Sequence, residues 1–452
     1  MTSPNSLFNP DFKPIKIVEV ELSEPIPTIN THNDAGDPVY GSAKLIVKLH
    51  TLPLRMIDLP LPTETVTAET VAEHIWEQLS TDINAHLQED GLPTVDSLPV
   101  TGLPYSETPA CIKVREQFGE DAPLVSVVIC THNRTEFIRD YFPSLLDIAY
   151  PNYELILVDN NPPDDSTRQF YDEHYADNPQ VHYVLEKRGG LSWARNAGIR
   201  HSRGEIIAFT DDDARVDPHW LTELVLGFDA AENVGCTTGQ VFPQELEYEV
   251  QTWFEQFGGL SAGGKDAIYG LGKYAPDSPI FPYNVGNYGG GVSMAFKRDC
   301  LYDVGGFEVR MATAGMPFGA EDIDMFVRVI LAGYQIAYRP RSFLRHAHRR
   351  DYEGLQRQMY RYGVGLMAFL THCAYTDPLW IFKIASKIPA AINHLTASDS
   401  RKNERKTDYP DELTSLERRG MLYGPIAYFK TRWQLRGATN DITPALPVGD
   451  GI

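Results

Sequence analysis

The sequence predicts an α/β protein with a mostly parallel sheet flanked by helices. Four short segments rich in β-branched residues occur in succession at residues 124–130, 153–158, 181–185 and 205–210. The segments between them are long enough for crossover helices, and this alternation is typical of parallel sheets with helices on both faces. In such sheets, ligands bind beyond the carboxyl ends of the strands, where the strand order reverses. The residues directly after each strand are therefore the first candidates for a site.

A small α+β unit is predicted upstream of this sheet. Residues 16–21, 43–49 and 54–61 are predicted strands because they are short and rich in apolar residues. Residues 67–88 are a predicted helix, since apolar side chains recur there every four positions. A stretch rich in Pro, Gly, Ser and Thr follows the helix and is typical of a linker.

We expect three domains in this chain. The first holds the α+β unit and its linker, the second holds the sheet, and the third is a helical extension with a tail. They span residues 1–115, 116–350 and 351–452. Within the third, residues 378–395 are apolar and include two lysines four positions apart. We favour packing of this stretch against the second domain, and contact with a membrane interface is the alternative.

Composition and charge narrow the class of protein. The 452 residues include 40 basic and 61 acidic side chains, and the net charge of -21 argues against nucleic acid as a partner. The five cysteines are an odd number with no CxxC pair, so we interpret them as packing residues in a reducing compartment. The N-terminal residues lack the pattern of a secretory signal, and no apolar window is long enough to span a bilayer. These features predict a cytoplasmic location.

Polar side chains follow three of the four predicted strands. They are Thr131, His132, Asn133 and Arg134 after the first, Asp159, Asn160 and Asn161 after the second, and Asp211, Asp212 and Asp213 after the fourth. Two carboxylates about 4 Å apart repel by roughly 4 kcal/mol at an effective dielectric of about 20, so the last group requires a counter-ion or shifted pKa values. Oxygen ligands suit Mg²⁺ or Mn²⁺, which are commonly shared with substrate phosphates. The sequence therefore predicts a divalent cation and a phosphate-bearing ligand.

Six motifs follow one another along the chain: VSVVICTHNR, LVDNN, GLSWARNAG, AFTDDD, GAEDIDMFVR and FLRHAHRR. In this order they resemble glycosyltransferase family 2, and the resemblance covers roughly residues 123–375. Members of that family are inverting enzymes of the GT-A fold that use nucleotide-sugars. The resemblance implies a GT-A-like, Rossmann-related sheet, preceded here by the small α+β domain and followed by the helical extension.

The same resemblance implies an activity. The chain is expected to be a metal-dependent hexosyl- or deoxyhexosyltransferase that uses Mg²⁺ or Mn²⁺. Its expected donor is a UDP- or dTDP-sugar, and its expected acceptor is a hydroxyl of a saccharide or of a lipid-linked molecule. Such a reaction belongs to the synthesis of cell-surface polysaccharides or glycoconjugates. A lipid-linked acceptor implies peripheral contact with the inner face of a membrane.

The resemblance also implies which residues line the nucleotide pocket. They are Thr131, Asn133, Arg134, Asp159, Arg195, Asn196, Asp211 and Asp212. Two of them lie in the segment KRGGLSWARNAG, where we expect a helix with Ser192 as its N-cap. Arg195 and Asn196 then fall in the first turn, near the edge of the sheet, where Arg195 can pair with phosphate or ribose oxygens.

The metal ligands implied by the resemblance are Asp213, Asp211 and His346. In an extended conformation, His346 and His348 lie on the same face of the chain, so either histidine can reach one point. The resemblance favours His346 as the ligand of the metal or of the diphosphate, and His348 stays open as the alternative.

An acidic pair begins a predicted helix at residues 319–328. Glu321 and Asp322 lie in its first turn, where the helix dipole makes a carboxylate a weaker base. Neighbouring carboxylates and partial burial act in the opposite direction and raise the pKa. The resemblance implies that Asp322 is the general base that deprotonates the acceptor hydroxyl, with Glu321 as the alternative.

Two other functions fit parts of the sequence. A nucleotidyltransferase usually has a Gly-rich loop with a basic residue after its first strand, whereas CTHNR contains no glycine. A non-catalytic protein that binds carbohydrate or nucleotide-sugar on the same fold is the second alternative. The acidic groups at residues 211–213 and 321–322 argue against it, because binding alone does not require both.

Overall fold

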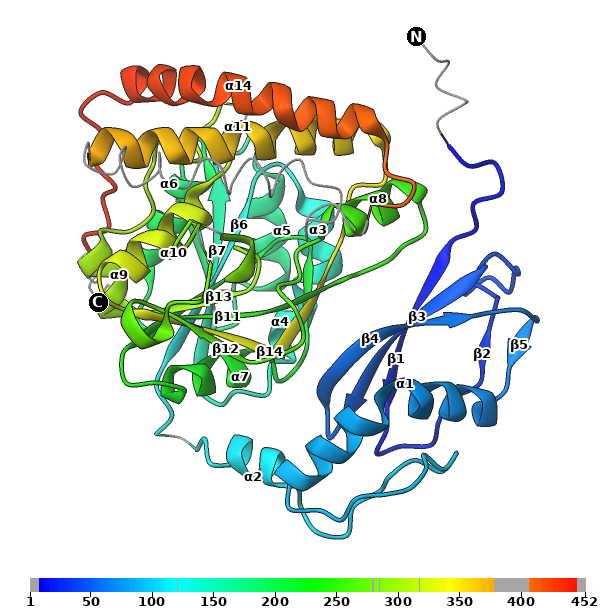
Figure 1. The fold of residues 1–452 in the computed structure, drawn as a ribbon. Helices are drawn as coiled ribbons and strands as arrows, with labels where there is room; N and C mark the ends of the chain where they lie inside the picture. The colour runs from blue at the N-terminus through cyan, green and yellow to red at the C-terminus, as the bar shows by residue number, and fades with distance from the viewer. Residues whose placement is uncertain are drawn as a thin grey trace.

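A nine-stranded sheet with helices packed around it forms the centre of the molecule (Figure 1). The computed structural model describes residues 8–119, 121–278, 280–283, 285–316, 318–377 and 406–444. The strands are β6 (Val125–Thr131), β7 (Tyr153–Asn160), β8 (Val181–Glu186), β9 (Ile206–Asp211), β10 (Ala214–Val216), β11 (Val234–Pro243), β12 (Ala267–Tyr269), β13 (Met294–Lys297) and β14 (Gln335–His346). The surrounding helices are α3 (Thr135–Tyr141), α4 (Pro143–Leu146), α5 (Ser166–His174), α6 (Leu191–His201), α7 (Trp220–Leu226), α8 (Glu249–Phe257), α9 (Arg298–Val304) and α10 (Glu321–Leu331). The predicted α/β fold class is confirmed.

The order of the strands fixes where a ligand site can form. The sheet reads β10-β14-β11-β13-β9-β6-β7-β8, with β12 paired to β14. The four strands predicted from the sequence are β6 to β9, and they are parallel to one another. The chain runs outward from β6 to β8 and then returns to the other side of β6 at β9. The strand order therefore reverses between β6 and β9, which is the switch point at which ligands bind in sheets of this kind.

Both faces of the sheet are buried. Val127 and Ile129 of β6 enter one hydrophobic core together with Trp220 of α7. Val128, between them in the strand, enters the other core together with Ala194 of α6. Burying a large apolar side chain fully contributes about 1.5–3 kcal/mol, so two such cores hold the carboxyl ends of the strands in a rigid frame.

The N-terminal region forms a smaller α+β unit with its own core, drawn in blue in Figure 1. Its elements are β1 (Ile15–Glu21), β2 (Ile29–Asn30), β3 (Ser42–Leu49), β4 (Leu52–Pro60), β5 (Thr65–Val66) and α1 (Ala68–Glu89), followed by α2 (Ala110–Glu116). β3 is parallel to β1 and antiparallel to β4. The hydroxyl of Thr67 caps α1 by accepting a bond from the amide of Thr70, and the four-residue repeat Val71, Ile75, Leu79 and Ile83 is buried.

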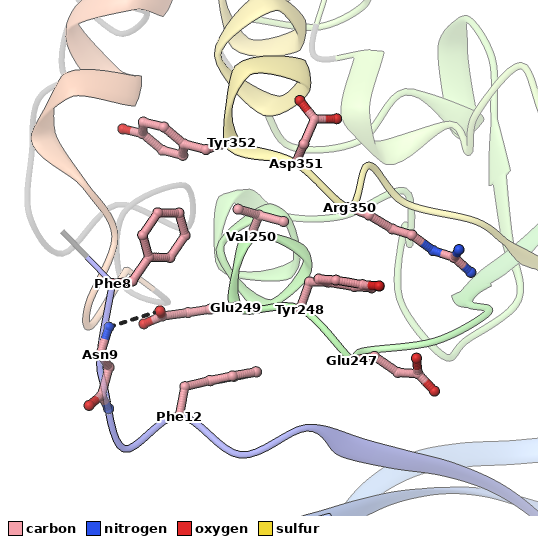
Figure 2. A pocket seen from close by; sticks show the side chains of 10 residues that line it. All are labelled: Phe8, Asn9, Phe12, Glu247, Tyr248, Glu249, Val250, Arg350, Asp351 and Tyr352. Atoms are coloured by element: carbon pink, nitrogen blue, oxygen red, sulfur yellow. Dashed lines mark hydrogen bonds between the residues drawn. The ribbon is translucent and has the colours of Figure 1, made fainter. Parts of the chain in front are cut away.

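Contacts of several kinds join this unit to the central sheet, among them the packing of Ile46 against Phe242 and Phe343. Arg115 of α2 donates through Nε to Oε1 of Glu223 in α7 at 2.9 Å, and both side chains are buried. The N-terminal lead passes α8, where Phe8 stacks on Trp253 with ring centroids 5.5 Å apart. Figure 2 shows the hollow of about 440 Å³ beside this contact, where the amide of Asn9 donates to Oε2 of Glu249 at 2.9 Å.

Two long parallel helices lie side by side along the top of the molecule in Figure 1, α11 (Tyr352–Thr376) and α14 (Asp411–Gln434), and the hydroxyl of Tyr352 at the start of the first donates to Oε2 of Glu412 at the start of the second. They approach closely through glycines, because a Cβ at Gly363 would lie 1.9 Å from the carbonyl oxygen of Glu417. None of the described helices is long and apolar enough to cross a membrane. The apolar stretch 378–395 lies outside the described residues.

All five cysteines are free, and four of them pack against apolar side chains as predicted. Cys236 and Cys300 are fully buried in one core of the sheet, and Cys130 packs against that core. Cys373 packs against a separate hydrophobic cluster that includes Val364 and Phe369 of α11. Cys111 differs, because its thiol donates to the carboxylate of Asp90 rather than filling an apolar gap. The interpretation of Cys111 as a packing residue is therefore wrong.

Candidate active site

The candidate site lies at the carboxyl ends of β6 and β9. Cys130 and Asp211 are partners in the parallel ladder between these strands, so the polar residues that follow each strand emerge at the same edge. On the other side of the group, β10 pairs with β14, and Ala214 lies opposite His346. Two distant segments of sequence thus meet at the switch point of the sheet.

Asp211, Asp213 and His346 form a group that fits a cation. One carboxylate or imidazole atom of each lies within 4.8 Å of the others. Nε2 of His346 is 3.0 Å from Oδ1 of Asp213, and both side chains are largely buried. Two carboxylates and one imidazole are ligands that Mn²⁺ and Mg²⁺ accept, with the remaining positions left for water or phosphate. The structure thus brings together the three residues predicted as metal ligands.

The protein itself neutralises part of the acidic charge. The Nη1 atom of Arg134 donates to Oδ1 of Asp212 at 2.6 Å, and its Nη2 atom donates to Oδ2 of Asp213 at 2.7 Å. The hydroxyl of Thr131 donates to Oδ2 of Asp212 at 2.7 Å. Asp212 is therefore held inside the protein by Thr131 and Arg134. Arg134, three residues after the end of β6, thus reduces the repulsion between these aspartates, on which the prediction of a divalent cation was based.

Burial and charge divide the protons between neighbouring aspartates. Burial raises the pKa of Asp212 to about 7, although the charge of Arg134 opposes this shift. Burial also favours the neutral form of Asp213, but His346 and Arg134 outweigh it and lower the pKa of Asp213 below its usual range. Asp213 is thus the carboxylate that stays ionised at neutral pH, as a metal ligand must.

The helix that carries Arg195 begins earlier than the sequence predicts. Gly190 is the residue before α6, with φ of 133°, and a Cβ there would lie 2.5 Å from the carbonyl oxygen of Ala312. Ser192 lies inside the helix, and its hydroxyl donates to the carbonyl oxygen of Glu308 at 3.0 Å. The prediction of Ser192 as the N-cap is wrong, and Arg195 lies in the second turn rather than the first.

Arg195 connects the triple-aspartate segment to the acidic pair of α10. Its Nη1 atom donates to Oε1 of Glu321 at 2.9 Å, and its Nη2 atom lies 3.5 Å from Oδ1 of Asp211. Burial raises the pKa of Glu321 to about 7, while Arg195 opposes this shift. Oε2 of Glu321 is buried without a hydrogen-bond partner among the described residues.

Asp322 is the more accessible member of the pair. Its Oδ2 atom accepts a bond from the amide of Gly291 at 3.1 Å, and its Oδ1 atom accepts one from the amide of Ile323 at 2.8 Å. Asp322 is partly exposed, whereas the side chain of Glu321 is buried. The role of the Gly291 amide has no signal in the sequence, because it depends on how the glycine-rich segment before β13 folds over α10.

Asp159 has an unused acceptor at the same edge. Its side chain is fully buried at the end of β7, and Oδ2 accepts a bond from the hydroxyl of Tyr183 at 2.7 Å. Oδ1 has no partner among the described residues. Burial raises the pKa of Asp159, although the bond from Tyr183 opposes this shift. Tyr183 has no signal in the sequence, because only the pairing of β7 with β8 brings it to Asp159.

Three other predicted residues do not join this group. The side-chain amide of Asn196 binds both backbone groups of Phe307 and the carbonyl oxygen of Asn440, so its polar atoms are occupied. Nε2 of His348 lies 2.8 Å from Oε1 of Glu255, away from the aspartates. Asn133 is exposed in the turn after β6, with a positive φ of 52°.

The fold and this edge define an α/β protein whose ligand site lies at a sheet switch point and combines carboxylates, an imidazole and two arginines. Residues 126–297 match the family model described as glycosyl transferase family 2. This match spans the central sheet from β6 to β13.

Curated relatives align over about half of this chain. An uncharacterized protein of Sinorhizobium fredii, y4gI, is 28% identical over 232 residues, which are 50% of this chain and 25% of that protein. Glucosyl-dolichyl phosphate glucuronosyltransferase of Haloferax volcanii is 26% identical over 226 residues, which are 49% of this chain and 68% of that protein. Poly-beta-1,6-N-acetyl-D-glucosamine synthase of Staphylococcus epidermidis is 24% identical over 242 residues, which are 53% of this chain and 54% of that protein. The chain thus spans between a quarter and two thirds of the length of these relatives.

Proposed function

We propose that this chain is an inverting glycosyltransferase that moves a hexosyl or deoxyhexosyl group from a nucleoside diphosphate sugar to a hydroxyl group. The observation that carries the proposal is the position of Asp211, Asp213 and His346 at the switch point, with the acidic pair of α10 joined to them by Arg195. The group offers a cation site and a candidate base at one edge of the sheet, as a single displacement at an anomeric carbon requires.

In this proposal, Asp211, Asp213 and His346 hold Mg²⁺ or Mn²⁺. The bound cation supplies charge stabilisation for a departing diphosphate. The free Oδ1 atom of Asp159 accepts a hydrogen bond from the base or ribose of a UDP- or dTDP-linked donor. Arg134 holds Asp213 in position, since its guanidinium bridges Asp213 and the neighbouring Asp212.

Asp322 is the proposed general base. Two backbone amides orient its carboxylate, and its partial exposure lets an acceptor approach. The acceptor oxygen forms a bond to the anomeric carbon as its proton passes to Asp322, and the bond to the diphosphate breaks with its electron pair. Glu321 is the alternative base, because burial raises its pKa to about 7.

We propose a lipid-linked or saccharide acceptor and peripheral contact with a membrane. An exposed apolar stripe runs along α14, formed by Leu422, Ile426, Phe429 and Trp433. Exposed basic residues on the same helix, Arg418, Arg419 and Lys430, match the charge of anionic lipid headgroups. The Haloferax relative is named for a dolichyl phosphate substrate, and the Staphylococcus relative is a polysaccharide synthase, which supports both acceptor classes.

We also propose that residues 1–115, 116–350 and 351–452 are the three domains of the chain, with the transferase site in the second. The separate hydrophobic core of the N-terminal unit supports the first boundary.

A screen of nucleotide-sugars tests the proposed function. Wild-type protein is incubated with each donor and with Mn²⁺ or Mg²⁺, and the release of nucleoside diphosphate is measured. We expect metal-dependent release from at least one donor, and much less from the Asp213→Asn variant. Binding of a donor without release under any condition would instead support the non-catalytic alternative.

A further inference from the structure

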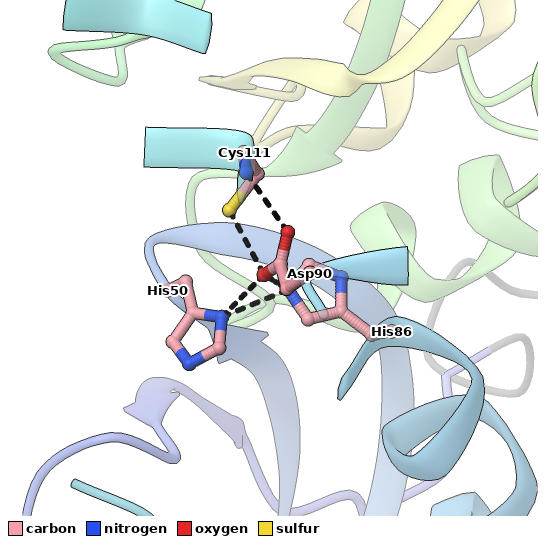
Figure 3. Close-up of side chains that lie close together, drawn as sticks. All are labelled: His50, His86, Asp90 and Cys111. Atoms are coloured by element: carbon pink, nitrogen blue, oxygen red, sulfur yellow. Dashed lines mark hydrogen bonds and ion pairs between the residues drawn. The ribbon is translucent and has the colours of Figure 1, made fainter. Parts of the chain in front are cut away.

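A second group of side chains with metal-ligating atoms lies in the N-terminal unit. Figure 3 shows four side chains that converge from separate elements: His50 from the turn between β3 and β4, His86 and Asp90 from the end of α1, and Cys111 from the first turn of α2. One ligand atom of each lies within 4.8 Å of the others. None of these four residues belongs to the candidate active site.

The distances are close to those of a tetrahedral metal site. Oδ2 of Asp90 is 2.6 Å from Nδ1 of His50, 3.0 Å from Nε2 of His86 and 3.1 Å from Sγ of Cys111. Nδ1 of His50 and Nε2 of His86 are 3.2 Å apart. Around zinc, with bonds of about 2.0 Å to N and O and 2.3 Å to S, neighbouring ligand atoms stand roughly 3.3 Å apart. Small side-chain movements would place all four atoms around one ion.

Hydrogen bonds alone explain this group poorly. Nδ1 of His50, Nε2 of His86 and the thiol of Cys111 all converge on Oδ2 of Asp90, so up to three hydrogens share one oxygen. The two ring nitrogens also face each other, and both cannot be donors at 3.2 Å without repulsion. One cation in place of these hydrogens would accept electron pairs from two imidazole nitrogens, a carboxylate and a thiolate together.

The surroundings resemble those of a closed structural site. His50, His86 and Asp90 are at most 7% exposed, and their polar atoms have little access to water. His50 and Thr51 adopt positive φ angles of 55° and 64°, as a tight two-residue turn between β3 and β4 requires, and this turn brings His50 to the group. Four protein ligands leave no open position for a substrate, as in structural rather than catalytic zinc sites.

We propose that His50, His86, Asp90 and Cys111 bind a structural Zn²⁺ ion. The thiolate ligand favours zinc over Mg²⁺ or Mn²⁺, which distinguishes this site from the all-oxygen-and-imidazole group at the edge of the large sheet. On binding, the thiol of Cys111 loses its proton to solvent as the sulfur–metal bond forms.

The ion fixes the junction between the N-terminal unit and the large sheet. It ties α2 to α1 and to the β3–β4 turn through Cys111. On the same helix, Arg115 donates to the hydroxyl of Thr51 at 2.6 Å and to Glu223 of α7 at 2.9 Å. The metal and Arg115 thus hold α2 from both sides, and loss of the metal loosens this junction.

Cobalt substitution in the full-length protein tests the proposal. Metal-free protein is titrated with Co²⁺, and the absorbance is recorded. We expect one equivalent of Co²⁺ with a thiolate-to-cobalt charge-transfer band and tetrahedral d–d bands, which Zn²⁺ then displaces. The band requires a cysteine ligand, so the aspartate and histidine group at the sheet edge cannot produce it, and it persists in the Asp213→Asn variant.

Matched variants assign the ligands. Cys111→Ser should abolish the charge-transfer band, whereas Cys373→Ser, at a cysteine outside the group, should keep it. His86→Gln should abolish the tetrahedral spectrum, whereas His74→Gln on the same helix should leave it unchanged. If the ligand variants fail to fold, wild-type protein still decides: Zn²⁺ must raise the melting temperature of metal-free protein. The absence of both the band and this shift, or a band that survives Cys111→Ser, overturns the proposal.

Discussion

Arg195 lies between Asp211 and Glu321, with Nη2 3.5 Å from the first carboxylate and Nη1 2.9 Å from the second. The side chains of Arg195 and Glu321 are both about 5% exposed or less, so their charges are withdrawn from water. Because Asp211 follows β9 and Glu321 begins α10, this guanidinium joins the two halves of the proposed site. Its removal affects both stability and the position of the acidic pair.

Replacement of Arg195 by leucine should destabilise the fold strongly. The buried carboxylate of Glu321 would lose its cation, and breaking a buried ion pair in this way costs about 3–5 kcal/mol. Urea unfolding of the variant and the wild type measures the difference. As a control, Arg168→Leu removes an exposed pair with Asp172, and a loss of no more than about 1 kcal/mol is expected there. Equal losses in the two variants would contradict the importance of the Arg195 bridge.

Replacement of Asp213 by asparagine should lower metal-dependent turnover by roughly 100-fold or more, since metal ions contribute several kcal/mol of charge stabilisation and each 1.36 kcal/mol is tenfold in rate. Steady-state release of nucleoside diphosphate over a range of Mn²⁺ concentrations measures the effect. Asp172→Asn, at an exposed side chain of α5, is the matched control and should retain full activity. Unchanged turnover in Asp213→Asn would remove this residue from the proposed metal site.

Asparagine at position 322 and glutamine at position 321 distinguish the two candidate bases. We expect Asp322→Asn to reduce transfer by roughly 10²–10⁴-fold, the usual contribution of a general base, while donor affinity stays near that of the wild type. Glu321→Gln should retain more activity, because its role is to pair with Arg195. The reverse order of activities would assign the base to Glu321.

Metal affinity should increase with pH. Burial lowers the pKa of His346, but Asp213 outweighs this and raises it, so in metal-free protein the imidazole keeps its proton to a higher pH than a free histidine does. A metal must displace that proton, and its apparent affinity therefore rises as the pH approaches and passes the raised pKa. Calorimetric titration with Mn²⁺ at several pH values measures the slope and the protons released.

The stability of the metal-free protein should change in the opposite direction. Since the pKa of His346 is raised in the folded state, its pair with Asp213 contributes stability below the unfolded histidine pKa of about 6.5 and loses it as the pH rises through the folded value. His346→Gln should remove both pH dependences. His348→Gln, at a histidine paired instead with Glu255, should leave them in place, and an unchanged slope in His346→Gln would exclude this histidine as the source.

Charged substitutions on α14 test the proposed membrane contact. Changing exposed Leu422 and Trp433 to glutamate should reduce binding to vesicles of anionic lipid, because apolar area is lost and two negative charges are added. Cosedimentation of the full-length protein with vesicles measures the bound fraction, and neutral vesicles show the contribution of charge. Equal binding of the double variant and the wild type would exclude this face of α14.

Local sequence patterns determined much of the framework. The four β-branched segments at β6 to β9 and the four-residue repeat of α1 formed as predicted, because each depends on which side chains of a short stretch are apolar. The placement of acidic residues at the end of β9 follows from the same local pattern. The start of α6 was not predicted correctly. Gly190, with a positive φ that the nearby backbone of Ala312 requires, precedes the helix where Ser192 was expected.

The sequence by itself determined the class of fold, the edge of the sheet that carries polar residues, and the acidic character of the proposed site. Only the tertiary structure decided which charges meet there: Arg134 with Asp212 and Asp213, and Arg195 with Asp211 and Glu321. It also decided that His50, His86, Asp90 and Cys111 converge, although no spacing in the sequence indicates it. Periodicity is a property of neighbouring residues, whereas contacts between distant side chains depend on how complete elements pack against one another.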